Sequence, residues 1–518
     1  MAARGRLSRL WLGIGGLMLL VGAFRIAESG GGLALLGGVA AILGAVAVVR
    51  RPALGIMIYL TTFLFTYPSF LRGVGNFTIN NVLGLILLPL MFYGLLRDGS
   101  FWLPRFKPVV ILGVIVGLMI ASGMFYTPSS EYGLVLEQEK IARSQRAQGP
   151  ALISTRDAGA KFLTRYVFLL FFVFFIRTPR DLKLVVGMIV ACLLMTYFSV
   201  STEAGPFGWG TGRLRVLGET GAAVYAGRNP NKLAYFALFG LTLLWYARRA
   251  IKSPIAYPFW FVATAITFIM IPLTGSRSGL LNLLFFFAIV LMEGRFSYRK
   301  VAGLALVTIF ITVQFGYNLS VVDLLFPEDV ATRLTRFDVR AEILEEEGLE
   351  AAGSAEGRVR TAQAAVRVWQ GYPAFGVGIG NFESERAATD PFGTIGPPHN
   401  SYLWALAEGG IVNFALYLWV YYWVFRKLRS IEWEYQARFG PVGLGWLVSG
   451  MRTALLGFLL FSFFADMWHH VLFYIIIGIC LATIRLHDVY AETGQVPGPF
   501  TIGRPIEPVR IPAPSAGT

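Results

Sequence analysis

Residues 257–292 read YPFWFVATAITFIMIPLTGSRSGLLNLLFFFAIVLM, an apolar run in which Arg277 is the only charged residue. Thr274, Gly275 and Ser276 interrupt the run near its centre. At about 1.5 Å of rise per residue, each half is long enough to cross most of a hydrocarbon core of about 30 Å. The run therefore predicts a hairpin of two membrane helices with an arginine at its tip.

Arg277 has two interpretations at that tip. An ionisable residue near membrane depth costs at least about 2.5 kcal/mol unless it is paired or hydrated, so such residues are candidates for function. An interfacial arginine can also extend its guanidinium to the lipid headgroups and have no further role. We favour the functional interpretation.

The rest of the chain has the same membrane character. Of the 518 residues, 55% are hydrophobic and only 14% are charged, and the mean hydropathy is +0.61. A soluble domain carries about 25% charged residues. We predict an all-α polytopic membrane protein with about 12–14 transmembrane helices. The expected spans lie near residues 11–27, 31–49, 53–71, 77–96, 108–126, 162–176, 184–202, 231–247, 256–272, 279–293, 301–317, 400–425, 446–464 and 468–485.

Basic residues in alternate short loops set the predicted orientation, because such residues collect on the cytoplasmic side of a membrane. They precede the first expected span and recur in every second loop, which places both termini in the cytoplasm. The formal net charge of +15 then reflects this anchoring, and nucleic-acid binding is a poor explanation for it. The basic clusters are Arg4, Arg6 and Arg9; Arg50 and Arg51; Arg97, Arg105 and Lys107; Arg177, Arg180 and Lys183; Arg248, Arg249 and Lys252; Arg295, Arg299 and Lys300; and Arg426, Lys427 and Arg429.

The spans and loops divide the chain into six expected segments. These are N-terminal membrane helices (1–126), an outer loop (127–161), a membrane core with arginine clusters (162–317), a large periplasmic loop (318–398), C-terminal membrane helices (399–486) and a disordered cytoplasmic tail (487–518) rich in Pro and Gly. A cleaved signal peptide competes with a retained first span, but no clear small-x-small site follows the apolar run. Cys192 and Cys480 fall inside expected spans and support neither a disulfide framework nor a metal site.

The large loop has an internal helical pattern. Val359, Ala362, Val366 and Trp369 recur at helical spacing, while Arg360, Gln363, Arg367 and Gln370 occupy another face. We expect an amphipathic helix that lies over the outer face of the bundle. Ser354 is its predicted N-cap, with Glu356 in the first turn, and Tyr372, Pro373 and Gly376 end it.

A second polar cluster precedes the expected span at residue 231. Arg213 and Arg215 lie in an outer loop, and Asn229 followed by Pro230 suits the cap and start of a helix. The free N–H groups of that helix start would offer a site for an anion. An ordinary surface loop with routine capping explains the same residues.

His399 marks a third cluster, where the large loop re-enters the membrane as Asn400, Ser401, Tyr402 and Leu403. A histidine there can act as a general base near neutral pH, or it can simply form hydrogen bonds at the interface. His469, with Asp466, lies at the last outer turn and is a weaker candidate. Arg358, after Gly357, is a further cation of the loop.

Gly376, Gly378 and Gly380 form a G-x-G-x-G pattern without a surrounding strand or βαβ unit. We therefore expect a tight turn against the bundle, and a dinucleotide fingerprint is a poor interpretation. The chain has no P-loop, no H-E-x-x-H and no D-x-D motif. If this protein handles a phosphate group, arginine side chains must neutralise it.

Taken together, these clusters resemble the O-antigen ligase and polymerase superfamily of bacterial membrane glycosyltransferases. They span about residues 213–412 and follow the order found in the family. Two features depart from the family's pattern: the outer loop is long, and the number of expected spans is larger than in many ligases. The resembling residues are the arginines before Asn229-Pro230-Asn231; Thr274-Gly275-Ser276-Arg277-Ser278-Gly279; Gly357-Arg358 with Trp369 and Pro373; the turn at 376–380; and His399-Asn400-Ser401-Tyr402-Leu403 with Glu408, Gly409 and Gly410.

The resemblance implies an enzyme of the bacterial inner membrane with a periplasmic active site. It would transfer a glycan from an undecaprenyl-pyrophosphate carrier to a sugar hydroxyl, with inversion and without a metal or other cofactor. By position, His399 matches the catalytic histidine, and Arg277, Arg215 and, second to it, Arg213 match the pyrophosphate-binding arginines. Arg358, Asn400 and His469 are expected to support them.

Several functions remain open at this point. A polymerase of O-antigen or exopolysaccharide extends a lipid-linked chain, whereas a ligase moves the finished chain to lipid A–core in lipopolysaccharide assembly. We lean to polymerase, because the long outer loop leaves room for a polymeric acceptor. The family also works beside a flippase and a chain-length regulator. A multi-pass transporter is the alternative of another class, although transporter sites usually lie near the bilayer midplane.

Overall fold

A computed structural model describes residues 43–64, 79–97, 106–126, 155–204, 230–251, 254–274, 276–293, 348–389, 397–439, 444–468, 470–492, 495–497 and 508–510. This part of the chain is helical except for two strands of three residues. The helices are α3 (Pro52–Leu64), α4 (Ile79–Arg97), α5 (Lys107–Phe125), α7 (Thr155–Phe175), α8 (Pro179–Ala204), α10 (Pro230–Ala247), η4 (Arg248–Ala250), α11 (Ala256–Leu273), α12 (Arg277–Met292), α16 (Gly348–Gly371), α17 (Phe382–Thr389), α18 (Ser401–Phe439), α19 (Leu444–Phe461) and α20 (Val471–Glu492).

The protein is an all-α polytopic membrane protein. Among the described residues, four helical stretches are long and apolar enough to cross a membrane: Lys107–Phe125, Ala158–Phe175, Ser401–Tyr435 and Val471–Val489. Shorter apolar helices occupy Pro52–Thr61, Val82–Leu96, Ala256–Pro272, Ser278–Met292 and Gly445–Phe461. The predicted spans from 53–71 onward have helical counterparts, except span 301–317, which lies outside the described residues together with spans 11–27 and most of 31–49.

The apolar run at 257–292 folds as predicted, into a hairpin of α11 and α12. Thr274 is the C-cap of α11, and Ser276 is the N-cap of α12, where its hydroxyl accepts the N–H of Gly279 at 3.0 Å. Arg277 is the first helical residue of α12, so the arginine does lie at the tip.

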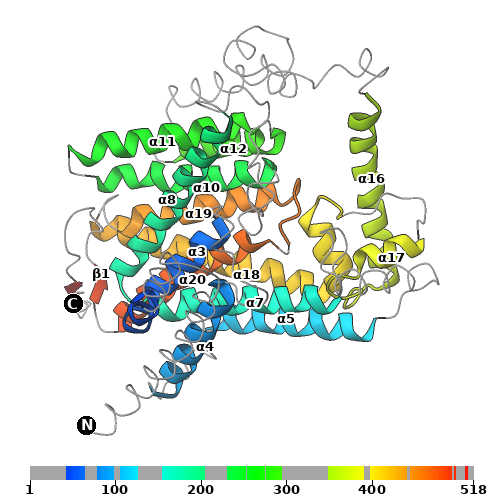
Figure 1. Ribbon diagram of the computed structural model, residues 1–518, viewed down its shortest axis with the longest axis horizontal. Coiled ribbons are helices and arrows are strands. Elements are labelled where there is room, and N and C mark those ends of the chain that lie inside the picture. The colour runs from blue at the N-terminus through cyan, green and yellow to red at the C-terminus, as the bar shows by residue number, and fades with distance from the viewer. Residues whose placement is uncertain are drawn as a thin grey trace, which may run out of the picture.

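The bundle has two distinct ends. At one end α5, α8, α11 and α19 finish and α7, α10, α12, α18 and α20 begin; we call it the His399 end. The other, basic end gathers those arginines and lysines of the alternate loops that the structure describes. Arg51 pairs with Asp181 at 2.8 Å, Arg249 with Glu293 at 3.4 Å, and Lys427 with Asp488 at 4.0 Å. Figure 1 shows most bundle helices running between these two ends, with α16 standing across the His399 end.

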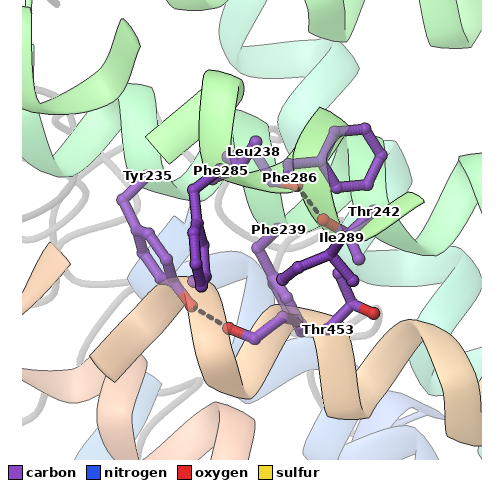
Figure 2. A pocket seen from close by; sticks show the side chains of 10 residues that line it. Tyr235, Leu238, Phe239, Thr242, Phe285, Phe286, Ile289 and Thr453 are labelled. Carbon is purple, nitrogen blue, oxygen red and sulfur yellow. Dashed lines mark hydrogen bonds between the residues drawn. The ribbon is translucent and has the colours of Figure 1, made fainter. Parts of the chain in front are cut away.

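The interior between the two ends is filled by aromatic and aliphatic side chains. Figure 2 shows where α10, α12 and α19 meet around Tyr235, Phe239 and Phe286. The Tyr235 hydroxyl donates to the carbonyl of Ala454 at 3.0 Å, and Thr242 donates to the carbonyl of Leu238 at 2.8 Å. These hydroxyls are satisfied by backbone carbonyls, so the junction packs without a ligand.

The helix predicted in the large loop is α16, but two details of that prediction are wrong. The helix begins at Gly348, so Ser354 lies inside it and is not the N-cap; Glu350, Ala351 and Ala352 are strong helix formers that extend it. The buried face is also different. Ala365 and Val368 pack against Val377, Phe382 and Ala407, while Val359 remains 58% exposed.

The glycine turn at 376–380 attaches the large loop to the bundle, as its pattern predicts. Gly376, Gly378 and Gly380 have φ values of 66°, 79° and 79°, in the left-handed region that favours glycine. The N–H of Gly378 donates to the carbonyl of Glu408 at 2.8 Å, and the N–H of Gly380 donates to the Glu408 carboxylate at 2.9 Å. A Cβ at Gly378 would overlap the backbone of Gly123 in α5.

α18 continues further than the predicted span 400–425 and is interrupted within its length. Gly410 has φ 63° and ψ −176°, which breaks the helix, and a side chain there would meet the carbonyl of Ala374. Ile411 and Val412 donate their N–H groups to Pro373 and Ala374 at 2.8 and 3.2 Å. The break thus gives the large loop backbone partners within α18.

The composition of the tail predicted disorder throughout residues 487–518, and this prediction is wrong for part of the segment. α20 runs to Glu492, and β1 (Gln495–Pro497) pairs antiparallel with β2 (Pro508–Arg510), with Val496 opposite Val509. The strand pair forms because the two valines suit a strand and because the backbone N–H and C=O groups of the two strands bond to one another. α7 likewise begins at Thr155, within the predicted outer loop 127–161.

We predict that Gly378→Ala destabilises the protein by roughly 2–5 kcal/mol, from left-handed strain and overlap with the α5 backbone. Gly117→Ala is the matched control, because a Cβ at that α5 glycine meets nothing within 4 Å. Thermal unfolding in detergent should show a lower midpoint for Gly378→Ala alone. Equal midpoints for the two variants would contradict the role of this turn.

Candidate active site

The candidate site lies at the His399 end, at the start of α18. His399 has φ 50°, the single positive φ of a non-glycine residue among the described residues. Such a conformation costs about 1–3 kcal/mol and persists where the surrounding structure imposes it. Its side chain is 44% exposed, so the imidazole is accessible to a substrate.

His399 is paired with Asp466, which lies in the connection between α19 and α20. The His399 Nδ1 is 3.1 Å from Oδ1 and 3.2 Å from Oδ2 of Asp466, whose side chain is only 11% exposed. A carboxylate on Nδ1 favours the tautomer with its proton there and leaves Nε2 as the acceptor. The pair therefore has the geometry of a histidine base oriented by an acid.

Ser401 and Asn400 fix the backbone around this pair. The Ser401 hydroxyl donates to the carbonyl of Ala465 at 2.6 Å and accepts the N–H of Met467 at 2.7 Å. These bonds hold the residues on either side of Asp466 against the start of α18. The side-chain oxygen of Asn400 caps α18, because it accepts the N–H groups of Tyr402 and Leu403 at 3.0 and 3.1 Å.

Lys232 brings a cation to the site from the first turn of α10. One turn deeper, Tyr235 stacks on Phe461 of α19 with ring centroids 5.1 Å apart, so this face of α10 lies against the end of α19. Lys232 consequently lies beside the connection that carries Asp466, and it interacts electrostatically with Asp466 and with Arg165.

Arg165 adds a second cation from α7. Phe162, one turn earlier, packs against Trp468 and Tyr474 with ring centroids 6.0 Å apart in both pairs. This contact places the same face of α7 beside the α19–α20 connection and the start of α20. Asp466 is thus paired with His399, next to the start of α18, and interacts with Lys232 of α10, while Arg165 of α7 lies near Lys232.

The helix ends add to the positive potential. α7, α10, α12, α18 and α20 all begin at the His399 end, and each helix start carries about half a positive elementary charge. α12 and α10 are in close contact there, because a Cβ at Gly279 would overlap the Cβ of Ala234. Free N–H groups and cations at one end of an apolar bundle form a site suited to a phosphate.

The remaining predicted site residues are only partly described. The side chain of Arg277 and the whole of Arg213, Arg215, Asn229 and His469 lie outside the described residues. Arg358 is exposed on α16, and no contact among the described residues joins it to His399. Asn400 has a clear capping role. The structure therefore pairs His399 with Asp466, with which Lys232 also interacts, and Arg165 lies near Lys232.

Comparison with known families matches a part of the chain that includes His399. The family model described as O-Antigen ligase matches residues 262–418. The chain carries an O-antigen ligase domain. The domain extends from α11 into α18 and includes Arg277, Arg358, His399 and Asn400. No curated protein matches the chain.

Lys232, Arg165 and Asp466 lie outside the matched residues 262–418. The sequence singled them out less strongly than it did Arg277 and His399. A signal for two of them was present. Arg165 is the only charged residue of the predicted span 162–176, and Lys232 is the only one of span 231–247. The criterion that identified Arg277, a lone charge in a membrane helix, applies equally to both. Asp466 had no comparable signal, because it lies in a short loop.

We expect Ser401→Ala to lower the free energy of unfolding by about 1–3 kcal/mol, because it removes the partner of a buried carbonyl and a buried N–H. Ser430→Ala, on an exposed position of α18, is the control and should leave stability within about 0.5 kcal/mol. Chemical denaturation monitored by tryptophan fluorescence measures both. A Ser401→Ala variant as stable as Ser430→Ala would show that these two bonds are dispensable.

Proposed function

We propose that this protein is an inverting, metal-independent glycosyltransferase of surface polysaccharide assembly that uses an undecaprenyl-pyrophosphate-linked glycan as donor. The pairing of His399 with Asp466, beside Lys232 and Arg165, is the observation that carries the proposal. It combines a base with an anion site, the two functions that transfer from a pyrophosphate carrier requires. The O-antigen ligase domain supports the same class of reaction.

The proposed reaction is a single displacement. The acceptor hydroxyl oxygen attacks the anomeric carbon of the donor sugar while its proton passes to Nε2 of His399. The bond between the anomeric carbon and the pyrophosphate oxygen breaks, and its electron pair leaves with the pyrophosphate. Asp466 stabilises the imidazolium that forms, and the attack from the opposite face inverts the configuration.

The leaving pyrophosphate gains charge as the bond breaks, and cations must stabilise it. Arg277 and Arg215, with Arg213 as a second choice to Arg215, are proposed as guanidinium forks that bind its oxygens bidentately. We add Lys232, which interacts with Asp466, and Arg165, which lies near Lys232. This set would replace a divalent ion, in keeping with the lack of a D-x-D motif in the sequence. Arg358 and His469 remain proposed supporting residues.

The acceptor decides between polymerase and ligase, and we propose polymerase. Attack by the terminal hydroxyl of a repeat unit extends a chain, whereas attack by lipid A–core completes lipopolysaccharide. The outer loop, from which α16 and α17 are described, provides a surface for a polymeric acceptor. A flippase that delivers the donor and a chain-length regulator are the proposed partners.

We further propose that the protein lies in the bacterial inner membrane with its His399 end in the periplasm. The basic end supports this orientation, because Arg51, Arg249 and Lys427 gather there and basic residues favour the cytoplasmic side. Both termini would then be cytoplasmic. The carrier would enter the site from the bilayer, and the growing glycan would remain in water.

His399→Ala should abolish transfer, a loss of about 10²–10⁴-fold, while the protein stays folded. Purified protein is incubated with undecaprenyl-pyrophosphate-linked repeat units alone, and the products are separated by size. A ladder of longer lipid-linked products, absent in His399→Ala and reduced in Asp466→Asn, is the expected result. Transfer that appears only after lipid A–core is added would identify a ligase, and full activity in His399→Ala would remove it as the base.

Lys232→Met should raise the KM for the donor by about tenfold or more, because it removes one charge-assisted contact to the pyrophosphate. Lys427→Met is the matched control at the basic end, where Lys427 lies near Asp488. Initial rates at varied donor concentration measure both variants. A donor KM unchanged in Lys232→Met would exclude this lysine from the anion site.

A further inference from the structure

A groove of about 650 Å³ runs between α16 and the start of α18. Val359, Ala362, Gln363, Val366 and Arg367 of α16 line one side, and Leu403 of α18 lines the other. This volume lies in the range of small-molecule sites, about 300–1,000 Å³. The groove is open to solvent, so a ligand longer than the groove can extend beyond it.

The groove uses the apolar stripe of α16 that does not pack against the bundle. Val359 is 58% exposed, and Ala362 and Val366 are only half-buried, although all three recur on one face of the helix. The packed face is formed instead by Ala365 and Val368. Apolar side chains left partly open on a helix stripe indicate a surface that another molecule covers.

The polar residues of the groove lie along the edge of this stripe. Gln363 and Arg367 are one helical turn apart and exposed, so an amide and a guanidinium face the same opening. The amide offers both donors and an acceptor, and the guanidinium offers donors in a fixed fork. The wall therefore alternates aliphatic patches with groups that bind neighbouring hydroxyls.

We propose that this groove binds the acceptor glycan, which rests on the proposed glycosyltransferase function. Sugar rings present apolar C–H faces and a rim of hydroxyls, and both features match the wall of α16. An isoprenoid chain fits poorly, because α16 stands across the bundle ends with Arg358, Arg360 and Arg367 exposed (Figure 1). A long apolar tail there would lie in water rather than in hydrocarbon.

The groove is continuous with the catalytic residues. Leu403 lies one turn from His399. Its N–H donates to the side-chain oxygen of Asn400, which follows His399 directly and caps α18. A glycan that lies against α16 can therefore bring its terminal hydroxyl to His399. α16 has 24 residues and is about 36 Å long, which leaves room for further sugars along the helix.

The chain offers a selective way to test this site. Its two cysteines, Cys192 and Cys480, are both buried, so one engineered cysteine can be labelled alone. Gln363→Cys places the thiol in the groove. Gln370→Cys is the matched control on an exposed position of the same helix that does not line the groove. The full-length protein in nanodiscs is treated with a maleimide, with and without an oligosaccharide released by mild acid from the donor repeat units.

The oligosaccharide should slow labelling of Gln363→Cys by about tenfold at saturation and leave Gln370→Cys unchanged. Equal rates with and without oligosaccharide in Gln363→Cys would overturn the proposal. Slowing by undecaprenyl phosphate but not by the oligosaccharide would also overturn it, in favour of a lipid site. The labelling rate measures binding and does not require transfer. If the oligosaccharide protects Gln363→Cys but the protein transfers no sugar, the proposed function is refuted and the glycan-binding site is not.

Kinetics give a second readout in active protein. Arg367→Ala should raise the KM for the acceptor roughly tenfold, the effect of about one lost charge-assisted hydrogen bond, with the donor KM unchanged. Arg360→Ala, on an exposed position of α16 outside the groove, is the matched control and should change neither. An acceptor KM that is the same in both variants would contradict the assignment even if transfer itself proceeds.

Discussion

Asp466 is the residue on which the arrangement of the His399 end depends. It is a largely buried carboxylate at the edge of an apolar bundle, where a charge is costly unless opposite charges and donors surround it. His399, next to the start of α18, pairs with it, and Lys232 of α10 interacts with it electrostatically. Arg165 of α7 lies near Lys232. One carboxylate thus ties together helices that are far apart in sequence, and it gives the exposed histidine a fixed orientation.

The second constraint is the close approach of backbones where the large loop meets the bundle. Gly376 and Gly378 place the loop directly on Glu408 and Gly123, and Gly410 breaks α18 beside Ala374. Only residues without a Cβ permit these contacts, and a positive φ makes each of them costly to replace. The contacts set α16 against the start of α18, so the groove and His399 share one rigid support.

The two ends of the bundle differ in their electrostatics. The basic end balances its arginines with carboxylates, as Arg51 does with Asp181 and Arg452 with Glu432 at 2.8 Å. The His399 end combines Lys232 and Arg165 with several helix starts, against the carboxylate of Asp466. The positive charge at the His399 end therefore suits an anion, whereas the basic end balances its charges in ion pairs.

The sequence by itself determined the membrane class, the α11–α12 hairpin and the glycine turn, because apolar runs and glycine patterns are local signals. It also singled out His399 as a candidate. It also contained Arg165 and Lys232 as lone charges in expected spans, although their significance was not apparent. Only the tertiary structure decided that Lys232 interacts with Asp466 and lies near Arg165, and that α16 packs through Ala365 and Val368. Those outcomes depend on which helix faces meet, and that depends on contacts between residues distant in sequence, which no local pattern records.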